Sequence, residues 1–212
     1  MDDHPVFRSG LAGLIGKESD LQICGEASSA EEAMKALSRL NADLVTLGLS
    51  LPGKSGLELI KDLRIQFPQL FILVVSMHAE HLYAERALKG GANGYIMKHA
   101  SPDMLVKAIR RVLRGEVYVS DKLSSTILNA FAGHGPTTPL SPVLQLSDRE
   151  FEVFRMVGEG TPARQIARQL AISSKTVDAH RAHIREKLRL QSGQELVCYA
   201  IRWVQTTKGE NS

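Results

Sequence analysis

Phe71-Ile72-Leu73-Val74-Val75 is a run of five consecutive apolar residues with no polar alternate. A strand of this composition has no face suited to water, so it is predicted to lie in a parallel sheet covered on both sides. Similar runs alternate with amphipathic segments along the first half of the chain. The expected elements are helix 5–17, strand 21–26, helix 29–40, strand 43–49, helix 57–67, strand 70–76, helix 80–89, strand 94–97 and helix 102–114. This alternation predicts an α/β doubly wound fold with its site at the carboxyl ends of the strands.

Residues 173–188 combine helical spacing with positive charge. Val177, Ile184 and Leu188 recur on one face, which can pack against a core. The opposite face carries polar and mostly basic side chains: Lys175, Asp178, Arg181, Arg185 and Lys187. DNA binding needs both features, because cations meet the phosphates and short side chains let a helix approach base edges. A solvated surface helix is the simpler alternative for this segment taken by itself.

The residues before this segment favour DNA binding. Thr161 is expected to cap a short helix over 163–170, with Pro162 at its first position, and residues 171–174 form a turn. A short helix, a tight turn and a longer basic helix make a helix-turn-helix. Ser147 and Glu150 have the spacing of a capping box for an earlier helix. A fourth helix is expected over about 195–204.

The pattern of these residues resembles the LuxR/NarL-type DNA-binding domain. The matching positions are Leu146-Ser147-x-Arg149-Glu150, Gly160, Ile166-Ala167, Ser173-x-x-Thr176-Val177-x-x-His180, Ile184, Lys187-Leu188 and Glu195-Leu196. Gln165 and Gly193 depart from the family without removing a core position. The resemblance implies an all-α four-helix DNA-binding domain over residues 144–208. Its expected DNA-binding residues are Ser173, Lys175, Thr176, Val177, Asp178, Ala179, His180, Arg181, Ala182, Arg185 and Lys187.

The same helices predict how DNA is contacted and how two copies meet. Lys175, Arg181 and Lys187 are expected on phosphates, whereas Asp178, Ala179 and Ala182 are expected to face base edges. The last helix carries more apolar residues than one side of a small domain must bury: Leu196, Val197, Ala200, Ile201 and Val204. We therefore expect dimerisation through this helix, as the resemblance also implies, and promoter DNA with two half-sites about one helical turn apart.

Four motifs in the first half resemble the response-regulator receiver domain, which has a flavodoxin-like fold. They are Asp2-Asp3-His4-Pro5, Leu51-Pro52-Gly53-x-Ser55-Gly56, Val75-Ser76-Met77-His78 and Gly94-Tyr95-Ile96-Met97-Lys98, and the resemblance covers residues 1–116. In that family an acidic pair binds Mg²⁺, an Asp on the third strand accepts a phosphoryl group, a hydroxyl and an aromatic residue switch, and a lysine contacts the phosphate. The residues that match these roles are Asp2, Asp3, Ser76, Tyr95 and Lys98.

Gly48 stands at the position of the phosphoacceptor. Glycine has no side-chain oxygen, so no acyl phosphate can form there, and one Mg²⁺ ligand is lost. Asp43 is no substitute, because it lies five residues earlier, or about 16 Å along a strand. Asp2, Asp3 and Lys98 are expected to form a salt-bridged remnant of the site. Asp3 is at most a weak metal ligand, so no cofactor and no phosphorylation at the usual position are expected.

The first strand of the receiver pattern has no counterpart in a sequence that opens at Met1-Asp2-Asp3. In the usual order 2-1-3-4-5 that strand is internal, so its loss exposes ladder groups and apolar faces. Two interpretations stay open: the true start lies a few residues upstream, or the receiver is compromised. Residues 117–143 are expected to link the domains, with a short helix over 119–132 that places Leu123, Ile127 and Phe131 on one side, then a Gly/Pro-rich stretch over 133–142.

Charge separates the two halves of the chain. Residues 1–140 carry 15 basic and 15 acidic side chains, residues 141–212 carry 11 and 8, and residues 160–190 carry seven and two. Such a concentration is typical of a nucleic-acid face. No apolar run approaches the roughly 20 residues of a membrane span. Cys24 and Cys198 each lie in an apolar stretch and are expected to be buried or half-buried free thiols, as in a reducing cytoplasm.

Together these features predict a cytoplasmic, sequence-specific DNA-binding transcription regulator. An enzyme is not expected, because the sequence offers no nucleophile–base pair or metal cluster. The competing interpretation is a degenerate receiver protein that modulates an intact regulator by heterodimerisation. The expected partners are double-stranded promoter DNA, a second copy of the chain, and a cognate histidine kinase or another receiver; no membrane partner is expected.

Overall fold

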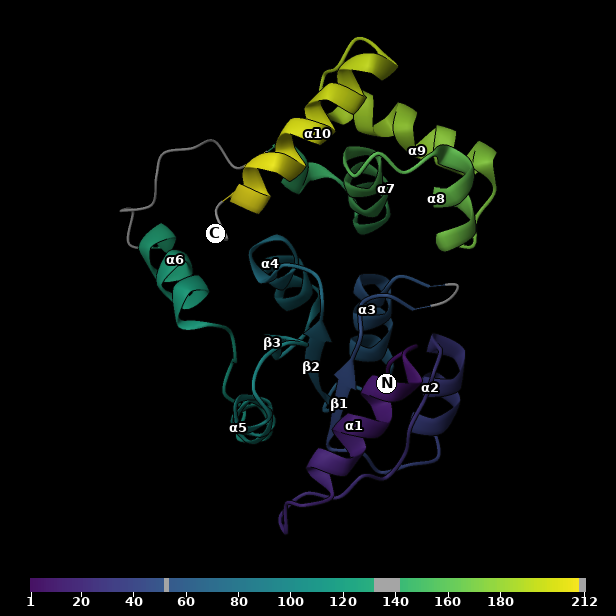
Figure 1. Ribbon diagram of the computed structural model, residues 1–212. Coiled ribbons are helices and arrows are strands. Elements are labelled where there is room, and N and C mark those ends of the chain that lie inside the picture. The colour runs from purple at the N-terminus through teal and green to yellow at the C-terminus, as the bar shows by residue number, and fades with distance from the viewer. Residues whose placement is uncertain (52–53, 132–141, 210–212) are drawn as a thin grey trace. The chain divides into compact units, whose positions relative to one another are not determined.

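The computed structural model describes residues 1–51, 54–131 and 142–209. The chain divides into two compact units, Met1–His134 and Gly135–Ser212 (Figure 1). Nearly all of the Gly/Pro-rich stretch expected over 133–142 lies outside the described residues.

The N-terminal unit alternates helices with strands. Its elements are α1 (Pro5–Ile15), α2 (Ala30–Leu37), β1 (Leu44–Leu47), α3 (Gly56–Gln66), β2 (Phe71–Ser76), α4 (Glu80–Gly90), β3 (Gly94–Met97), α5 (Pro102–Leu113) and α6 (Asp121–Phe131). The strands form a parallel sheet in the order β1-β2-β3, with Leu44 opposite Phe71 and Leu73 opposite Gly94. The predicted α/β doubly wound fold is confirmed.

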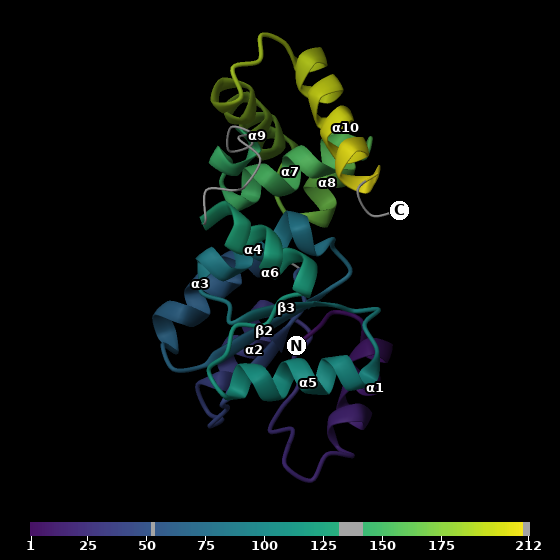
Figure 2. The same cartoon turned by 90° about the vertical axis from the view of Figure 1, so that its left-hand side faces the viewer.

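Helices cover both faces of the sheet, as Figure 2 shows for α5 on one side and α3 and α4 on the other. α5 packs Leu105, Ile109 and Val112 against strand residues that include Leu73 and Val75. The opposite layer buries apolar side chains of two helices: Leu57, Leu59, Ile60 and Leu63 of α3, and Tyr83, Ala84 and Ala87 of α4. β2 is consequently buried from its second residue to its last, as its uninterrupted apolar sequence predicts.

The strand predicted over 21–26 does not form, and that prediction was wrong. Residues 21–27 belong to no strand; Asp2 N–H donates to Ala27 O at 3.1 Å. Among the described residues no strand lies beside this segment, because the sheet ends at β1. An extended segment without a partner along its length forms no ladder. Cys24 is therefore exposed, contrary to the expectation of a buried thiol.

The C-terminal unit is a small helical domain. It consists of a 3-10 turn η1 (Pro142–Gln145) and the helices α7 (Asp148–Gly158), α8 (Ala163–Gln169), α9 (Ser174–Lys187) and α10 (Gly193–Gly209). Trp203 of α10 packs edge-on against Phe151 and Phe154 of α7, with ring centroids 5.7 and 5.4 Å away. Within the described ranges, no helix is long and apolar enough to cross a membrane.

Two helix boundaries and one thiol differ from expectation. Pro162, and not Thr161, is the N-cap of α8, because Pro162 has an extended backbone (φ −63°, ψ 147°) and the helix begins after it. α10 is longer than predicted and runs from Gly193 to Gly209. Cys198 is exposed and not buried, since it lies on the side of α10 away from Leu196 and Ala200, which are buried.

The first turn of α7 ties the C-terminal unit together. Ser147 and Glu150 form the predicted capping box. Glu150 Oε2 also accepts from Lys187 Nζ of α9 at 2.6 Å, and Arg149 Nη2 donates to Leu170 O at the end of α8 at 2.5 Å. Two adjacent side chains thus hold both helices of the helix-turn-helix.

A close approach between helices gives the first prediction. A Cβ on Gly158 of α7 would lie 2.5 Å from Ala200 O of α10, whereas a Cβ on Gly13 of α1 would meet nothing within 4 Å. Alanine in a helix is normally favoured over glycine by about 1 kcal/mol. We expect Gly13→Ala to stabilise the N-terminal unit, and Gly158→Ala to destabilise the C-terminal unit because backbone must move. Urea titration followed by Trp203 fluorescence measures the stability of the C-terminal unit, and scanning calorimetry measures that of the N-terminal unit. Stabilisation by Gly158→Ala would contradict the close packing.

A second prediction concerns Glu150. Its partial burial alone would raise the pKa, but the hydrogen bonds from Lys187 and Ser147 outweigh burial and lower it. A lowered folded-state pKa adds stability above the unfolded pKa of about 4.3, and this stability is lost as pH falls through the folded value. Glu150→Gln should therefore reduce the unfolding free energy by on the order of 1 kcal/mol at pH 7. The difference from the parent should vanish well below pH 4, as measured by Trp203 fluorescence; a difference that is constant with pH would contradict this.

Candidate DNA-binding surface and carboxyl-end cluster

The turn between α8 and α9 sets the position of α9. Ala171 has a positive φ of 51°, which turns the chain sharply after α8. Ser173 then caps α9, and its Oγ accepts from Thr176 N–H at 3.0 Å, as the sequence predicted. On the inner face of α9, Val177 and Ile184 are fully buried. The helix is thus fixed by its first turn and by one apolar stripe.

The opposite face of α9 is exposed and has small residues at its centre. Lys175 and Ala179 are exposed and Ala182 is half-buried, and these three share the side of the helix opposite Val177 by helical spacing. Two alanines on this side let the helix backbone come close to a groove floor, and Lys175 supplies a cation at the helix start. This combination of shape and charge is the one that a major groove accepts.

Most of the predicted DNA-binding residues are accessible, and one is not. Ser173, Lys175, Thr176, Asp178, Ala179 and Lys187 are exposed, and His180, Arg181, Ala182 and Arg185 are half-buried. Val177 is fully buried, so its assignment as a DNA-binding residue was wrong. The reason lies in its own spacing, because it shares the core-facing stripe with Ile184.

Charged neighbours constrain some of these residues. Lys187 pairs with Glu150 and remains 40% exposed, so its ammonium already has a partner in the domain. Arg181 lies 3.9 Å from Asp178 one turn earlier. His183 and Glu186 are also exposed on α9 and were not among the residues predicted to bind DNA. Helical spacing from Ala179 and Ala182 would have found them.

The residues predicted for dimerisation divide into two groups. Leu196, Ala200 and Val204 are buried on the α7 side, where Gly158 lies against Ala200 and Val204. The prediction that all five residues are available to a partner was therefore wrong for these three. Val197 and Ile201 are half-buried and stay accessible on α10.

At the carboxyl ends of the strands, Asp2 and Lys98 form a buried ion pair. Lys98 Nζ lies 2.8 Å from Asp2 Oδ1 and 2.6 Å from Asp2 Oδ2, and the side chains are 10% and 3% exposed. The lysine also lies 4.6 Å above the centroid of the Phe7 ring. This pair joins the start of the chain to the residue after β3, as the expected salt-bridged remnant requires.

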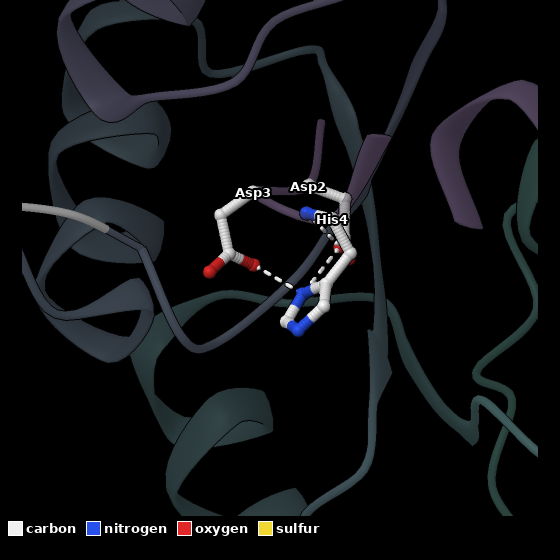
Figure 3. Close-up of side chains that lie close together, drawn as sticks. All are labelled: Asp2, Asp3 and His4. Atoms are coloured by element: carbon white, nitrogen blue, oxygen red, sulfur yellow. Dashed lines mark hydrogen bonds and ion pairs between the residues drawn. The ribbon is translucent and has the colours of Figure 1, made fainter. Parts of the chain in front are cut away.

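Asp3 pairs with His4, which also lies beside Asp2. Figure 3 shows Asp2, Asp3 and His4, whose possible ligand atoms all lie within 4.8 Å of one another. His4 Nδ1 is 2.7 Å from Asp3 Oδ1 and 3.3 Å from Asp2 Oδ1. His4 belongs to the first receiver motif, but no role was predicted for it. The set fits Mg²⁺ poorly, because this ion prefers oxygen ligands in an octahedron. The set offers an imidazole nitrogen, and the Lys98 ammonium lies within 2.8 Å of both Asp2 oxygens.

Gly48 directly follows β1 and lies against Asp2. Its N–H donates to Met1 O at 3.0 Å. A Cβ at this position would lie only 2.6 Å from Asp2 Oδ2. The Asp2 carboxylate therefore occupies space that a side chain at position 48 would need.

Ser76 and Tyr95 bind the loop after β2. Ser76 Oγ accepts from His78 N–H at 3.0 Å, and Tyr95 Oη donates to His78 O at 2.7 Å. Both side chains are buried, and burial raises the pKa of Tyr95, so its hydroxyl stays a neutral donor. The two side chains hold the backbone of His78, and the Ser76 carbonyl accepts from Lys98 N–H at 2.8 Å.

Comparison with known families agrees with both halves of this geometry. Residues 1–110 match the model of the response regulator receiver domain, and residues 144–200 match that of bacterial regulatory proteins of the luxR family. The chain is 36% identical over 205 residues to the oxygen regulatory protein NreC of Staphylococcus haemolyticus, covering 95% of this chain and 94% of that protein. NreC of Staphylococcus carnosus is 34% identical over a similar span.

Solved structures show the same two-domain architecture. RcsB from Salmonella enterica serovar Typhimurium bound to promoter rprA has a TM-score of 0.64 and 26% identity, covering 94% of this chain and 95% of that one. RcsB bound to promoter P1flhDC has a TM-score of 0.65 at the same identity and coverage. With both domain models matched and relatives aligned over nearly its whole length, this chain belongs to the NarL/FixJ response regulators, which join a receiver domain to a luxR-type DNA-binding domain.

Proposed function

We propose that this protein is a sequence-specific DNA-binding transcription regulator that acts without phosphorylation of its receiver domain at position 48. The observation that carries the first part is α9, with a buried stripe at Val177 and Ile184 and an open side at Lys175, Ala179 and Ala182. Its relatives support this function, since RcsB is solved on promoter DNA.

Two copies of the chain bind double-stranded DNA together. RcsB dimers are solved on DNA, and a two-fold protein calls for two half-sites about one helical turn apart. In this chain Val197 and Ile201, half-buried on α10, are the apolar residues that remain for a partner. A pairing that uses them buries less apolar area than the five residues first expected.

The receiver domain has no phosphoryl chemistry at its usual position. Gly48 supplies no oxygen, and the adjacent Asp2 carboxylate is committed to Lys98. The function accordingly needs neither Mg²⁺ nor an enzymatic step by this chain. Regulation then comes from protomer concentration, from a ligand at the strand ends or from pairing with another receiver. The protein acts in the cytoplasm, where promoter DNA lies.

The third prediction tests DNA binding directly. The purified chain alone should protect a discrete promoter site of two half-sites in a footprinting experiment. Arg181→Ala should weaken binding to specific and random DNA by similar factors and reduce the salt slope by about one, because one phosphate contact is lost. Asp178→Ala should instead change base preference, since an acidic side chain accepts from a cytosine amino group.

Lys35→Ala is the matched control, because it removes one cation from an exposed pair on α2 and should leave binding unchanged. Protection that appears only when an intact regulator is added would favour the heterodimeric modulator. One protomer per full site in analytical ultracentrifugation would refute the homodimer.

The fourth prediction concerns position 48. After incubation with a small phosphodonor and Mg²⁺, the parent chain should show no phosphoryl mass gain and no change in promoter affinity. Gly48→Asp requires the Asp2 side chain to move aside, because a Cβ at this position would lie 2.6 Å from Asp2 Oδ2. A third carboxylate then lies near Asp2 and Asp3, so Mg²⁺ should raise the melting temperature of this variant, since this ion is held through carboxylates. Gly48→Asn, of similar size without charge, should show no such rise. A phosphoryl mass gain on the parent chain with tighter DNA binding would contradict the proposal.

A further inference from the structure

The side of α9 opposite Val177 determines which bases this domain reads. Lys175, Ala179 and Ala182 lie on this side and Asp178 lies at its margin; these four residues are the reading stretch. At a rise of about 1.5 Å per residue, the stretch covers about 10 Å of helix. That length corresponds to about three base-pair steps of roughly 3.4 Å, so its side chains face neighbouring base pairs.

Purines are recognised by side chains that α9 lacks or directs elsewhere. Adenine is read by Asn or Gln, and α9 contains neither. Guanine is read by Arg or Lys. Arg181 and Arg185 are half-buried and lie, by helical spacing, beside the core-facing stripe. Lys175 therefore remains as the guanine reader of the stretch.

Polar groups on either side of the stretch already have partners within the domain. The hydroxyls of Ser173 and Thr176 bond each other at 2.8 Å, and Ser173 Oγ also accepts from Thr176 N–H. Lys187 pairs with Glu150, and His183 Nδ1 lies 4.0 Å from the same carboxylate. These groups fix the helix, and base reading falls to the stretch itself.

The centre of the reading stretch is apolar. Ala179 is exposed and Ala182 is half-buried, and about 4.5 Å of helix rise separates them, close to the spacing of neighbouring base pairs. The apolar group that a base pair presents in the major groove is the C5-methyl group of thymine, and alanine is one of the residues that contact it. The two alanine methyl groups therefore match two thymine methyl groups.

Acidic side chains near the alanines favour the same placement. The Asp178 side chain is 68% exposed, and its Oδ1 lies 3.9 Å from Arg181 Nη1, so the guanidinium offsets part of its charge near phosphates. Glu186 is exposed one turn after Ala182. Its charge repels phosphates at the C-terminal end of α9, which favours entry of the N-terminal half, where a helix-turn-helix contacts base edges.

We propose that each DNA half-site is recognised through two thymines, whose methyl groups contact Ala179 and Ala182. This inference rests on the proposed function and adds to it the bases that the half-site contains. Uracil has the hydrogen-bonding groups of thymine and lacks its methyl group. Replacing thymine by uracil consequently removes this contact and leaves the hydrogen bonds of the base pair intact.

The fifth prediction uses the full chain and a library of random synthetic duplexes. Selection for binding gives an enriched sequence, in which each thymine is then replaced singly by uracil. At two positions of each half-site, uracil should lower the affinity roughly fourfold, the contribution of about one buried methyl group. At the same two positions, 5-methylcytosine should bind more tightly than cytosine, because it carries the methyl group.

Two variants remove the protein side of the contact. Ala179→Gly and Ala182→Gly should each lose the sensitivity to uracil at one of the two positions and keep it at the other. Arg181→Ala is the matched control, because it should weaken binding to every duplex and keep the fourfold loss at both positions. Trp203 fluorescence measures whether each variant is folded, and the comparison of uracil with thymine on the parent chain needs no variant.

The outcomes separate this inference from the proposed function. A selected duplex that the parent chain binds equally well with thymine or uracil would overturn the inference and leave specific DNA binding intact. Equal losses with uracil in the parent and in both glycine variants would also overturn it, because other residues would then read the thymines. A library that yields no enriched sequence would overturn both the proposed function and this inference.

Discussion

A buried parallel strand needs hydrogen-bonding neighbours on both edges and cover on both faces, and the N-terminal unit depends on how far that requirement is met. β2 meets it fully, with β1 and β3 beside it and burial from Ile72 to Ser76. β1 meets it on one edge and, on the other, only at Met1. The consequences spread outward from this edge: residues 21–27 form no strand, the helix α1 has no fully buried residue, and a cavity remains beside Leu44 and Thr46.

The C-terminal unit is stabilised by contacts between helices. Its described residues, 142–209, form helices and no sheet. These helices are held by aromatic packing of Trp203 on Phe151 and Phe154 and by two charged side chains at the start of α7. Arg149 reaches the end of α8 and Glu150 reaches α9. The first turn of α7 thus contacts both helices of the helix-turn-helix.

The two candidate sites differ in how well sequence predicts them. On α9, helical spacing alone separates buried from exposed residues. Val177 was wrongly assigned to DNA binding because it matches the family pattern, although its helical spacing places it on the buried face. On α10, composition counted five apolar residues, but only packing shows that Leu196, Ala200 and Val204 turn toward α7. At the strand ends, sequence predicted that Asp2 and Lys98 meet. It could not predict that Asp3 turns to His4, because a single bond rotation decides between the two.

By itself the sequence determined the doubly wound order of elements, the helix-turn-helix, the capping box at Ser147 and the absence of a side chain at Gly48, since each follows from local spacing or from the identity of one residue. Tertiary structure alone decided whether the apolar segment 21–26 becomes a strand, because a strand exists only with a neighbour to bond. It also decided that the Asp2 carboxylate occupies the space beside Gly48, and that Lys187 forms an ion pair with Glu150. Contacts between residues distant in sequence set these outcomes, and no local pattern encodes them.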